Sequence, residues 1–138
     1  MLTENALIAS GKAVSAFTST PLAQGIFRIC IAESARFPEI GKAFFESGPK
    51  VMSAQVAALI TRGENAGDLV VPDKETAAIH FFLLCRGPHF YPMVLQLMDG
   101  VGQTERMRGL REGLETFSAR YGTQSFKPRM QEALKKLC

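Results

Sequence analysis

The sequence has little of what most catalytic and metal-binding sites require. Its 138 residues include only two histidines, His80 and His89, and no carboxylate stands at ligand spacing from them. The three cysteines, Cys30, Cys85 and Cys138, lie far apart and form no CxxC pair. No GxSxG, HExxH, P-loop or GxGxxG pattern occurs either. We therefore expect no metal ion, no cofactor and no enzymatic activity.

The chain also lacks a long apolar run. No stretch of about 18 apolar residues is present, so we expect no membrane-spanning segment and no membrane partner. The first residues contain no basic segment followed by a long apolar one, which a signal peptide would need. Cys30 and Cys85 stand in apolar stretches, as small buried side chains do in the reducing cytoplasm. These features favour a cytoplasmic protein.

Charge of either sign is moderate. Hydrophobic residues make up 46% of the chain and charged residues 21%, which is ordinary for a globular protein of one domain. The formal net charge is +3, and from residue 101 onwards eight basic residues stand against four acidic ones. A solvated helix face explains such a basic segment, and a nucleic-acid contact is the alternative.

Apolar residues recur at helical spacing, and this pattern predicts an all-α fold, a compact bundle of about six helices without a β-sheet. We expect helices over residues 3–18, 21–36, 38–47, 49–66, 74–98 and 103–121. The fifth should break near Arg86, because Gly87-Pro88 and Pro92 disrupt helical hydrogen bonds, and then resume through Met98. Residues 1–122 would form one domain, with an extended linker at 69–71, and residues 123–138 a basic tail or a last short helix.

The stretch from Ile26 to Pro49 is the most distinctive part of the sequence. Residues 26–31 leave almost no polar side, and a helix that is apolar nearly all round is usually buried on several sides. Pro38 disfavours helical geometry at Phe37 and suits the first turn of a new helix. We therefore expect a sharp bend there, with Phe37 as a buried anchor.

This stretch resembles the C-terminal regulatory domain of TetR-family bacterial transcription regulators, in the subgroup of AefR-like repressors with an AEAxRFPELxxxFYxxGP-like core. The matching residues are Ala32, Glu33, Arg36, Phe37, Pro38, Glu39, Ile40, Phe44, Phe45, Gly48 and Pro49. The resemblance continues through residues 67–73 and Ala77-Ala78. It implies a helical domain that binds an effector and forms a homodimer. Such regulators begin with a helix-turn-helix domain, and we expect none in this chain, so operator DNA would be bound only through that missing N-terminal domain.

The resemblance also implies a pocket for a small hydrophobic or amphipathic effector. The candidate pocket residues are apolar side chains on helical faces and a few polar groups near them: Phe27, Cys30, Ser34, Phe44, Met52, Val56, Phe81, Cys85, His89 and Tyr91. Ten phenylalanines and six methionines supply adaptable apolar surface. Packed core is the ordinary alternative for any one of these side chains.

In TetR-like proteins the last two long helices pair with their copies in a four-helix bundle. By resemblance these helices are about 74–98 and 103–121. Met107, Leu110, Leu114, Phe117 and Tyr121 recur at steps of three and four, a seam that should pack inside the domain. The adjoining face is the predicted dimer interface: Arg106, Gly109, Gly113, Thr116 and Arg120.

The function predicted from the sequence is therefore that of the effector-binding and dimerisation domain of a TetR-like repressor. A stand-alone helical dimerisation module without a ligand is the alternative, and a small helical enzyme is a third. A solid core would favour the second reading over the first.

Overall fold

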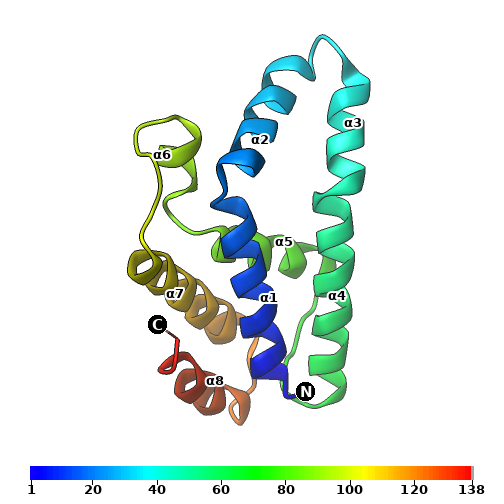
Figure 1. Ribbon diagram of the computed structural model, residues 1–138. Helices are drawn as coiled ribbons and strands as arrows, with labels where there is room; N and C mark the ends of the chain where they lie inside the picture. The colour runs from blue at the N-terminus through cyan, green and yellow to red at the C-terminus, as the bar shows by residue number, and fades with distance from the viewer. Residues whose placement is uncertain (138) are drawn as a thin grey trace.

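In the computed structural model, residues 1–137 are described and form eight α-helices. The body is built from α1 (Thr3–Thr18), α4 (Pro49–Asn65), α5 (Lys74–Arg86), α7 (Gln103–Tyr121) and α8 (Phe126–Leu134). Helix α5 packs on α4, α7 and α1, and α8 packs on α7 and α1 (Figure 1). No strand occurs among the described residues, so the predicted all-α class is confirmed.

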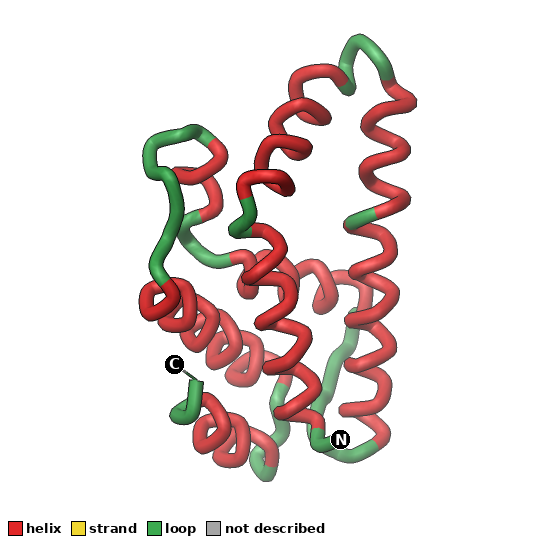
Figure 2. The backbone as a smooth tube through the Cα atoms, in the orientation of Figure 1, coloured by secondary structure: helices red, strands yellow, loops and turns green. Residues whose placement is uncertain are grey.

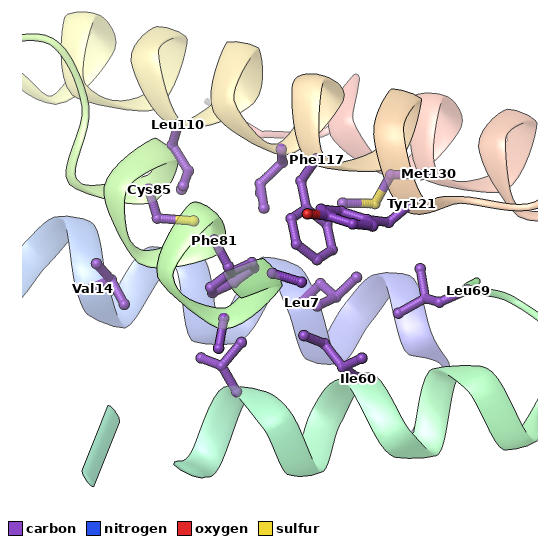
Figure 3. Close-up of a cluster of buried hydrophobic side chains, with 14 of the residues drawn as sticks. Leu7, Val14, Ile60, Leu69, Phe81, Cys85, Leu110, Phe117, Tyr121 and Met130 are labelled. Atoms are coloured by element: carbon purple, nitrogen blue, oxygen red, sulfur yellow. The ribbon is translucent and has the colours of Figure 1, made fainter. Parts of the chain in front are cut away.

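One cluster of buried side chains holds these helices together. Figure 3 shows side chains of α1, α4, α5, α7 and α8 meeting there, with Phe81 of α5 among them. The Phe81 ring lies edge-on to Phe117 of α7, with 5.3 Å between ring centroids. The whole predicted seam of α7 is buried, from Met107 to Tyr121, because that face meets α5 and α1.

Local signals set most helix starts. The Thr20 side chain accepts a hydrogen bond from the Ala23 amide and caps α2 (Pro21–Glu33). The Asp73 side chain accepts one from the Thr76 amide at 3.1 Å and caps α5. Between α4 and α5 the chain is extended, as predicted. Leu69 and Val71 are buried while Val70 is exposed, and Leu69 forms an isolated antiparallel bridge with Gly122.

The expected burial of residues 26–31 is wrong. Helices α2 (Pro21–Glu33) and α3 (Pro38–Ser47) extend away from the body as an arm, visible at the top of Figure 1. Ile29 and Ile31 are 61% and 66% exposed. Helix α2 packs on α3, on α6 (Phe90–Val94) and on the end of α1, so only part of its surface is covered.

Phe37 is likewise not a buried anchor. It lies in the turn between α2 and α3, its ring is 39% exposed, and the Arg36 guanidinium lies 5.1 Å from the ring centroid. The turn is at the far end of the arm from the body, as the smooth backbone of Figure 2 shows. A buried phenylalanine in a core would have many neighbours, and none of the body helices reaches this position.

Helix α5 breaks after Arg86 as predicted, but it does not resume through Met98. Gly87 ends it at φ +83°, and only the short α6 (Phe90–Val94) follows. Residues 95–102 are then non-helical, and Gln96 has a positive φ of 60°. Pro88 and Pro92 remove the amide hydrogens that a continuing helix would need.

The C-terminal segment belongs to the same core. Phe126, Met130, Leu134 and Leu137 are buried within the cluster, whereas Cys138 lies outside the described residues. Arg129 of α8 joins Glu4 of α1 (2.9 Å) and Asp68 of the linker (3.1 Å), two carboxylates that are almost fully buried. We call this ion-pair network the Arg129 clasp.

We expect Arg129→Met to lower the free energy of unfolding by about 3 kcal/mol, because it leaves two buried carboxylates without their cation. Urea denaturation monitored by circular dichroism measures the change. The control is Lys135→Met, which removes an exposed pair with Glu132 and should cost no more than about 0.5 kcal/mol. Equal effects of the two substitutions would contradict the importance of the clasp.

The effect of Arg129→Met should also depend on pH. Burial raises the pKa of Asp68, but hydrogen bonds from Arg129 and Thr3 outweigh it, so this pKa lies below its ordinary value. A lowered folded-state pKa stabilises the protein above the unfolded pKa of about 3.9, and this contribution is lost as the pH falls through the folded value. The difference between wild type and variant should therefore shrink below about pH 4.

Candidate effector site and dimer face

The predicted pocket residues fall into two groups. Val56, Phe81 and Cys85 belong to the packed core and are at most 1% exposed. Burial raises the pKa of the Cys85 thiol to about 12, so this thiol stays protonated. Met52 is half-buried and packs against the same cluster. These four side chains fill the body of the domain.

The second group lies in the arm. Phe27 and Cys30 on α2 and Phe44 on α3 are half-buried, and the Phe27 and Phe44 rings meet edge to face with 6.2 Å between centroids. Ser34 follows α2 and donates its hydroxyl hydrogen bond to the Cys30 carbonyl, and it lies against Gly41 of α3. The structure thus brings these four predicted residues together between α2 and α3.

Two residues outside the predicted pocket complete this group: Phe90 of α6 and Arg86 at the end of α5. Phe90 is buried, and its ring lies edge-on to Phe27 with 5.2 Å between centroids. The Arg86 guanidinium lies 4.0 Å from the Phe90 centroid and 5.5 Å from the centroid of Tyr91, which is itself 62% exposed. We call Phe27, Phe44, Arg86, Phe90 and Tyr91 the aromatic–arginine cluster. Phe27, Phe44 and Tyr91 were predicted from the sequence, whereas the Gly87-Pro88 break was the only sequence signal near Arg86 and Phe90.

Hydrogen bonds hold α6 against α2. Arg28 donates to the Val94 carbonyl at 3.2 Å, and the buried Gln24 amide donates to the Thr18 carbonyl at 3.2 Å and to the Met93 sulfur at 3.4 Å. The predicted pocket residue His89 is the residue before α6 and lines a neighbouring groove instead. The arm is therefore connected to the end of α5 through α6.

A groove of about 550 Å³ runs along α5 and α7. It is lined by Leu83, Leu84, Gly87, Pro88, His89, Glu105, Arg108, Gly109, Glu112, Gly113 and Thr116. Ile79 and Leu83 of α5 leave about half of their apolar surface in solvent, at 47% and 46%. Three residues of the predicted dimer face, Gly109, Gly113 and Thr116, thus lie beside exposed apolar side chains.

The two glycines of this face have a role within one chain. A Cβ atom at Gly113 would lie 2.5 Å from the Leu84 carbonyl oxygen, and one at Gly109 would lie 3.1 Å from Pro88. They therefore allow α7 to approach α5 and the chain that follows it. The expectation that Gly113 is free to meet a second copy is wrong, because Gly113 is buried under α5.

The two arginines of the predicted face differ in their contacts. Arg106 donates to Ser15 of α1 at 3.1 Å and to Gln103 at 2.8 Å, so it faces the body. The Arg120 guanidinium lies 4.9 Å from the Tyr121 ring centroid, near the end of α7. Neither lines the groove between α5 and α7.

Residues 1–137 hold no group of three or more histidine, cysteine or acidic side chains placed to bind a metal ion. None of the helices in this part of the chain is long and apolar enough to cross a membrane.

Comparison with known proteins accounts for this arrangement of helices. Residues 5–123 match the family described as AefR-like transcriptional repressor, C-terminal domain. The chain belongs to this family. The resemblance found in the sequence is thereby confirmed, and the domain is the C-terminal part of a TetR-family regulator.

Two solved structures share the fold of this AefR-like domain. A protein from Mesorhizobium loti MAFF303099, assigned as a TetR-family transcriptional regulator, superposes with a TM-score of 0.72 at 23% identity. The match covers 89% of this chain and 61% of that one, so the chain spans about three fifths of that regulator. The flavonoid-responsive regulator FrrA matches with a TM-score of 0.64 at 21% identity, over 88% of this chain and 74% of its own. No curated protein matches the chain.

We expect Gly113→Ala to lower the free energy of unfolding by about 1–3 kcal/mol, because the new methyl group would overlap the α5 backbone. The control is Gly25→Ala in α2, where the nearest atom to a Cβ is 3.8 Å away. That change should leave stability unaltered or raise it by up to about 1 kcal/mol through helix propensity. Stabilisation by both substitutions would show that α5 and α7 are not in close contact.

Proposed function

We propose that this AefR-like domain binds a small hydrophobic or amphipathic effector and forms a homodimer in the bacterial cytoplasm. In doing so it would control DNA binding by a helix-turn-helix domain of the intact regulator. The proposal rests on one observation above all. The aromatic–arginine cluster lies where the arm joins the body, next to the end of α5, and α5 also carries the exposed apolar side chains of the candidate dimer face.

Effector binding is supported by the chemistry of the arm. Binding sites for small molecules are mostly apolar with a few polar groups, and half-buried aromatic rings beside Arg86 match that description. The related fold of FrrA, named as flavonoid-responsive, favours an aromatic compound as the effector here. The arm is also the least enclosed part of the molecule, so its packing can change at low cost when a ligand enters.

Dimerisation is supported by the exposed face of α5. Ile79 and Leu83 lie one helical turn apart on α5 and remain about half exposed. Leu83 lines the groove along α7, and Ile79 lines a hollow with Pro49 and Ser53 of α4. Large apolar side chains grouped on one face are typical of protein–protein contacts. A stable contact buries on the order of 800 Å² per partner, which an antiparallel pairing of α5 and α7 with their copies would supply.

Both proposed activities involve α5, and this suggests how they are coupled. A ligand at the aromatic–arginine cluster would alter the position of α6 and the end of α5. That end lies beside the groove of the dimer face, lined by Gly87 and Pro88. The free energy of effector binding would then be coupled to the free energy of dimerisation through α5.

A second candidate is a dimerisation domain without a ligand. The packing of Val56, Phe81 and Cys85 favours it, because these predicted pocket residues fill the core. The two candidates differ only in whether the arm holds a molecule.

The effector is expected to accompany the protein on purification. Native mass spectrometry should detect a dimer with an added small mass that is lost under denaturing conditions. Phe44→Ala should remove the bound molecule while the dimer persists, because Phe44 faces Phe27. Phe45→Ala, at the adjacent and exposed position, is the control and should retain it. Absence of any added mass, or its retention in Phe44→Ala, would contradict this site.

The dimer is expected to persist at micromolar concentration in analytical ultracentrifugation. Leu83→Arg should produce monomers, because a twofold axis introduces the new charge twice into one apolar contact. Leu97→Arg is the control, since Leu97 is 77% exposed in the loop after α6. Sedimentation of the wild type as a monomer at about 100 μM would exclude an interface of ordinary strength. If the Leu83→Arg variant remained a dimer, the interface would lie on another face of the domain.

A further inference from the structure

We infer that Arg86 binds the anionic group of a planar aromatic ligand, with the rings of the aromatic–arginine cluster contacting the aromatic part. This inference rests on the proposed effector-binding function and specifies the chemical class of the effector. It begins from the unusual environment of Arg86 at the end of α5.

Arg86 differs from the other half-buried arginines in having no hydrogen-bond acceptor. Among residues 1–137, the half-buried arginines are Arg28, Arg86, Arg106 and Arg111. Arg28 donates to the Val94 carbonyl, Arg106 to Ser15 and Gln103, and Arg111 to the carbonyls of Leu134 and Leu137. The Nε of Arg86 is instead the buried side-chain nitrogen that lacks a partner in this part of the chain.

Three aromatic rings lie within 6 Å of the Arg86 guanidinium. It lies 4.0 Å from the Phe90 centroid, 5.5 Å from that of Tyr91 and 5.9 Å from that of Phe82. No carboxylate within the described residues pairs with it, whereas Arg129 pairs with two. Ring faces attract a cation, but they do not satisfy an N–H donor in its plane. The arginine thus retains its donors and its charge for another molecule.

A carboxylate is a better hydrogen-bond acceptor for the Arg86 guanidinium than a neutral polar group. The guanidinium presents its N–H groups in a planar fork that matches two carboxylate oxygens, and hydrogen bonds between charged groups are about twice as strong as neutral ones. A single arginine among apolar rings is unlike the clusters of basic residues that bind nucleic-acid backbones.

The rest of the ligand should be flat and aromatic. From Arg86 the rings continue through Phe90 to Phe27 and Phe44, with 5.2 Å and 6.2 Å between successive centroids. Aromatic rings prefer edge-to-face and offset contacts with other rings at these separations. Tyr91 is largely exposed and adds a ring at the outer side of the cluster.

The test uses isothermal titration calorimetry on the full chain. It compares the affinity for 2-naphthoate with the affinity for its neutral isostere, 2-naphthamide. The wild type should bind the carboxylate at least about tenfold more tightly, because the charge-assisted bond to Arg86 is absent in the amide. Arg86→Gln should remove this preference and leave affinity for 2-naphthamide within about twofold. Phe90→Leu should weaken both compounds.

Arg36→Gln is the matched control, because Arg36 also lies over a ring, that of Phe37, but at the exposed end of the arm. It should bind both compounds as the wild type does. The dependence on salt is a measurement independent of any substitution. Raising the ionic strength to about 0.5 M should weaken the binding of 2-naphthoate and leave the binding of 2-naphthamide unchanged. Equal binding of the two compounds by the wild type, or an unchanged preference in Arg86→Gln, would overturn the inference while leaving a neutral effector open.

Failure of both compounds to bind at about 1 mM, some 4 kcal/mol of affinity, would overturn the aromatic-anion class. The proposed effector function would then be judged separately by the mass spectrometry of the purified protein. Absence of a bound mass there would remove the effector function itself, whereas a bound neutral molecule would remove only the assignment to Arg86.

Discussion

The close approach of α5 and α7 is the constraint on which the rest of the domain depends. At Gly113 the α7 backbone comes so near to the Leu84 carbonyl that no other side chain fits between them. This contact allows Phe81 and Cys85 to reach the middle of the core, where Phe117 and Leu114 meet them. Protein interiors are packed as densely as organic crystals, so one close contact fixes the positions of many neighbours.

Helix α5 contributes residues to both the proposed dimer face and the proposed effector site. Helix α5 has one face in the core and another that leaves Ile79 and Leu83 exposed, and its C-terminal end carries Arg86. Gly87 then turns the chain so that α6 packs on α2 and brings Phe90 to Phe27. A continuous helix would have carried Phe90 away from the arm. The break in α5 thus allows α6 to pack on the arm.

The Arg129 clasp holds the start of α1, at the end of this helix that lies away from the arm. It joins the first turn of α1 to the linker and to α8, so the start of this helix is held by segments distant in sequence. The arm begins directly after α1, at Pro21. Helix α1 is therefore tied to distant segments at its start and continues into the arm after its other end.

The sequence by itself determined the local features of this protein. Helices α1, α3 and α7 begin and end where the sequence predicted, because prolines, glycines and apolar periodicity act over a few residues. The buried seam of α7 and the extended linker at 69–71 follow from the same local patterns. The family was also evident, since its motif lies within one continuous stretch from Ala32 to Pro49.

Only the tertiary structure decided which apolar surfaces are covered. Ile29 and Ile31 are as apolar as any core residue, yet they are exposed, because α3, α6 and the end of α1 cover only part of α2. Phe90 meets Phe27 because segments about sixty residues apart in the chain pack together. The same packing leaves the Arg86 Nε without a hydrogen-bond acceptor. Apolar periodicity identifies a face that can be buried, but the partner that buries it, or leaves it open, is set by contacts that no local pattern encodes.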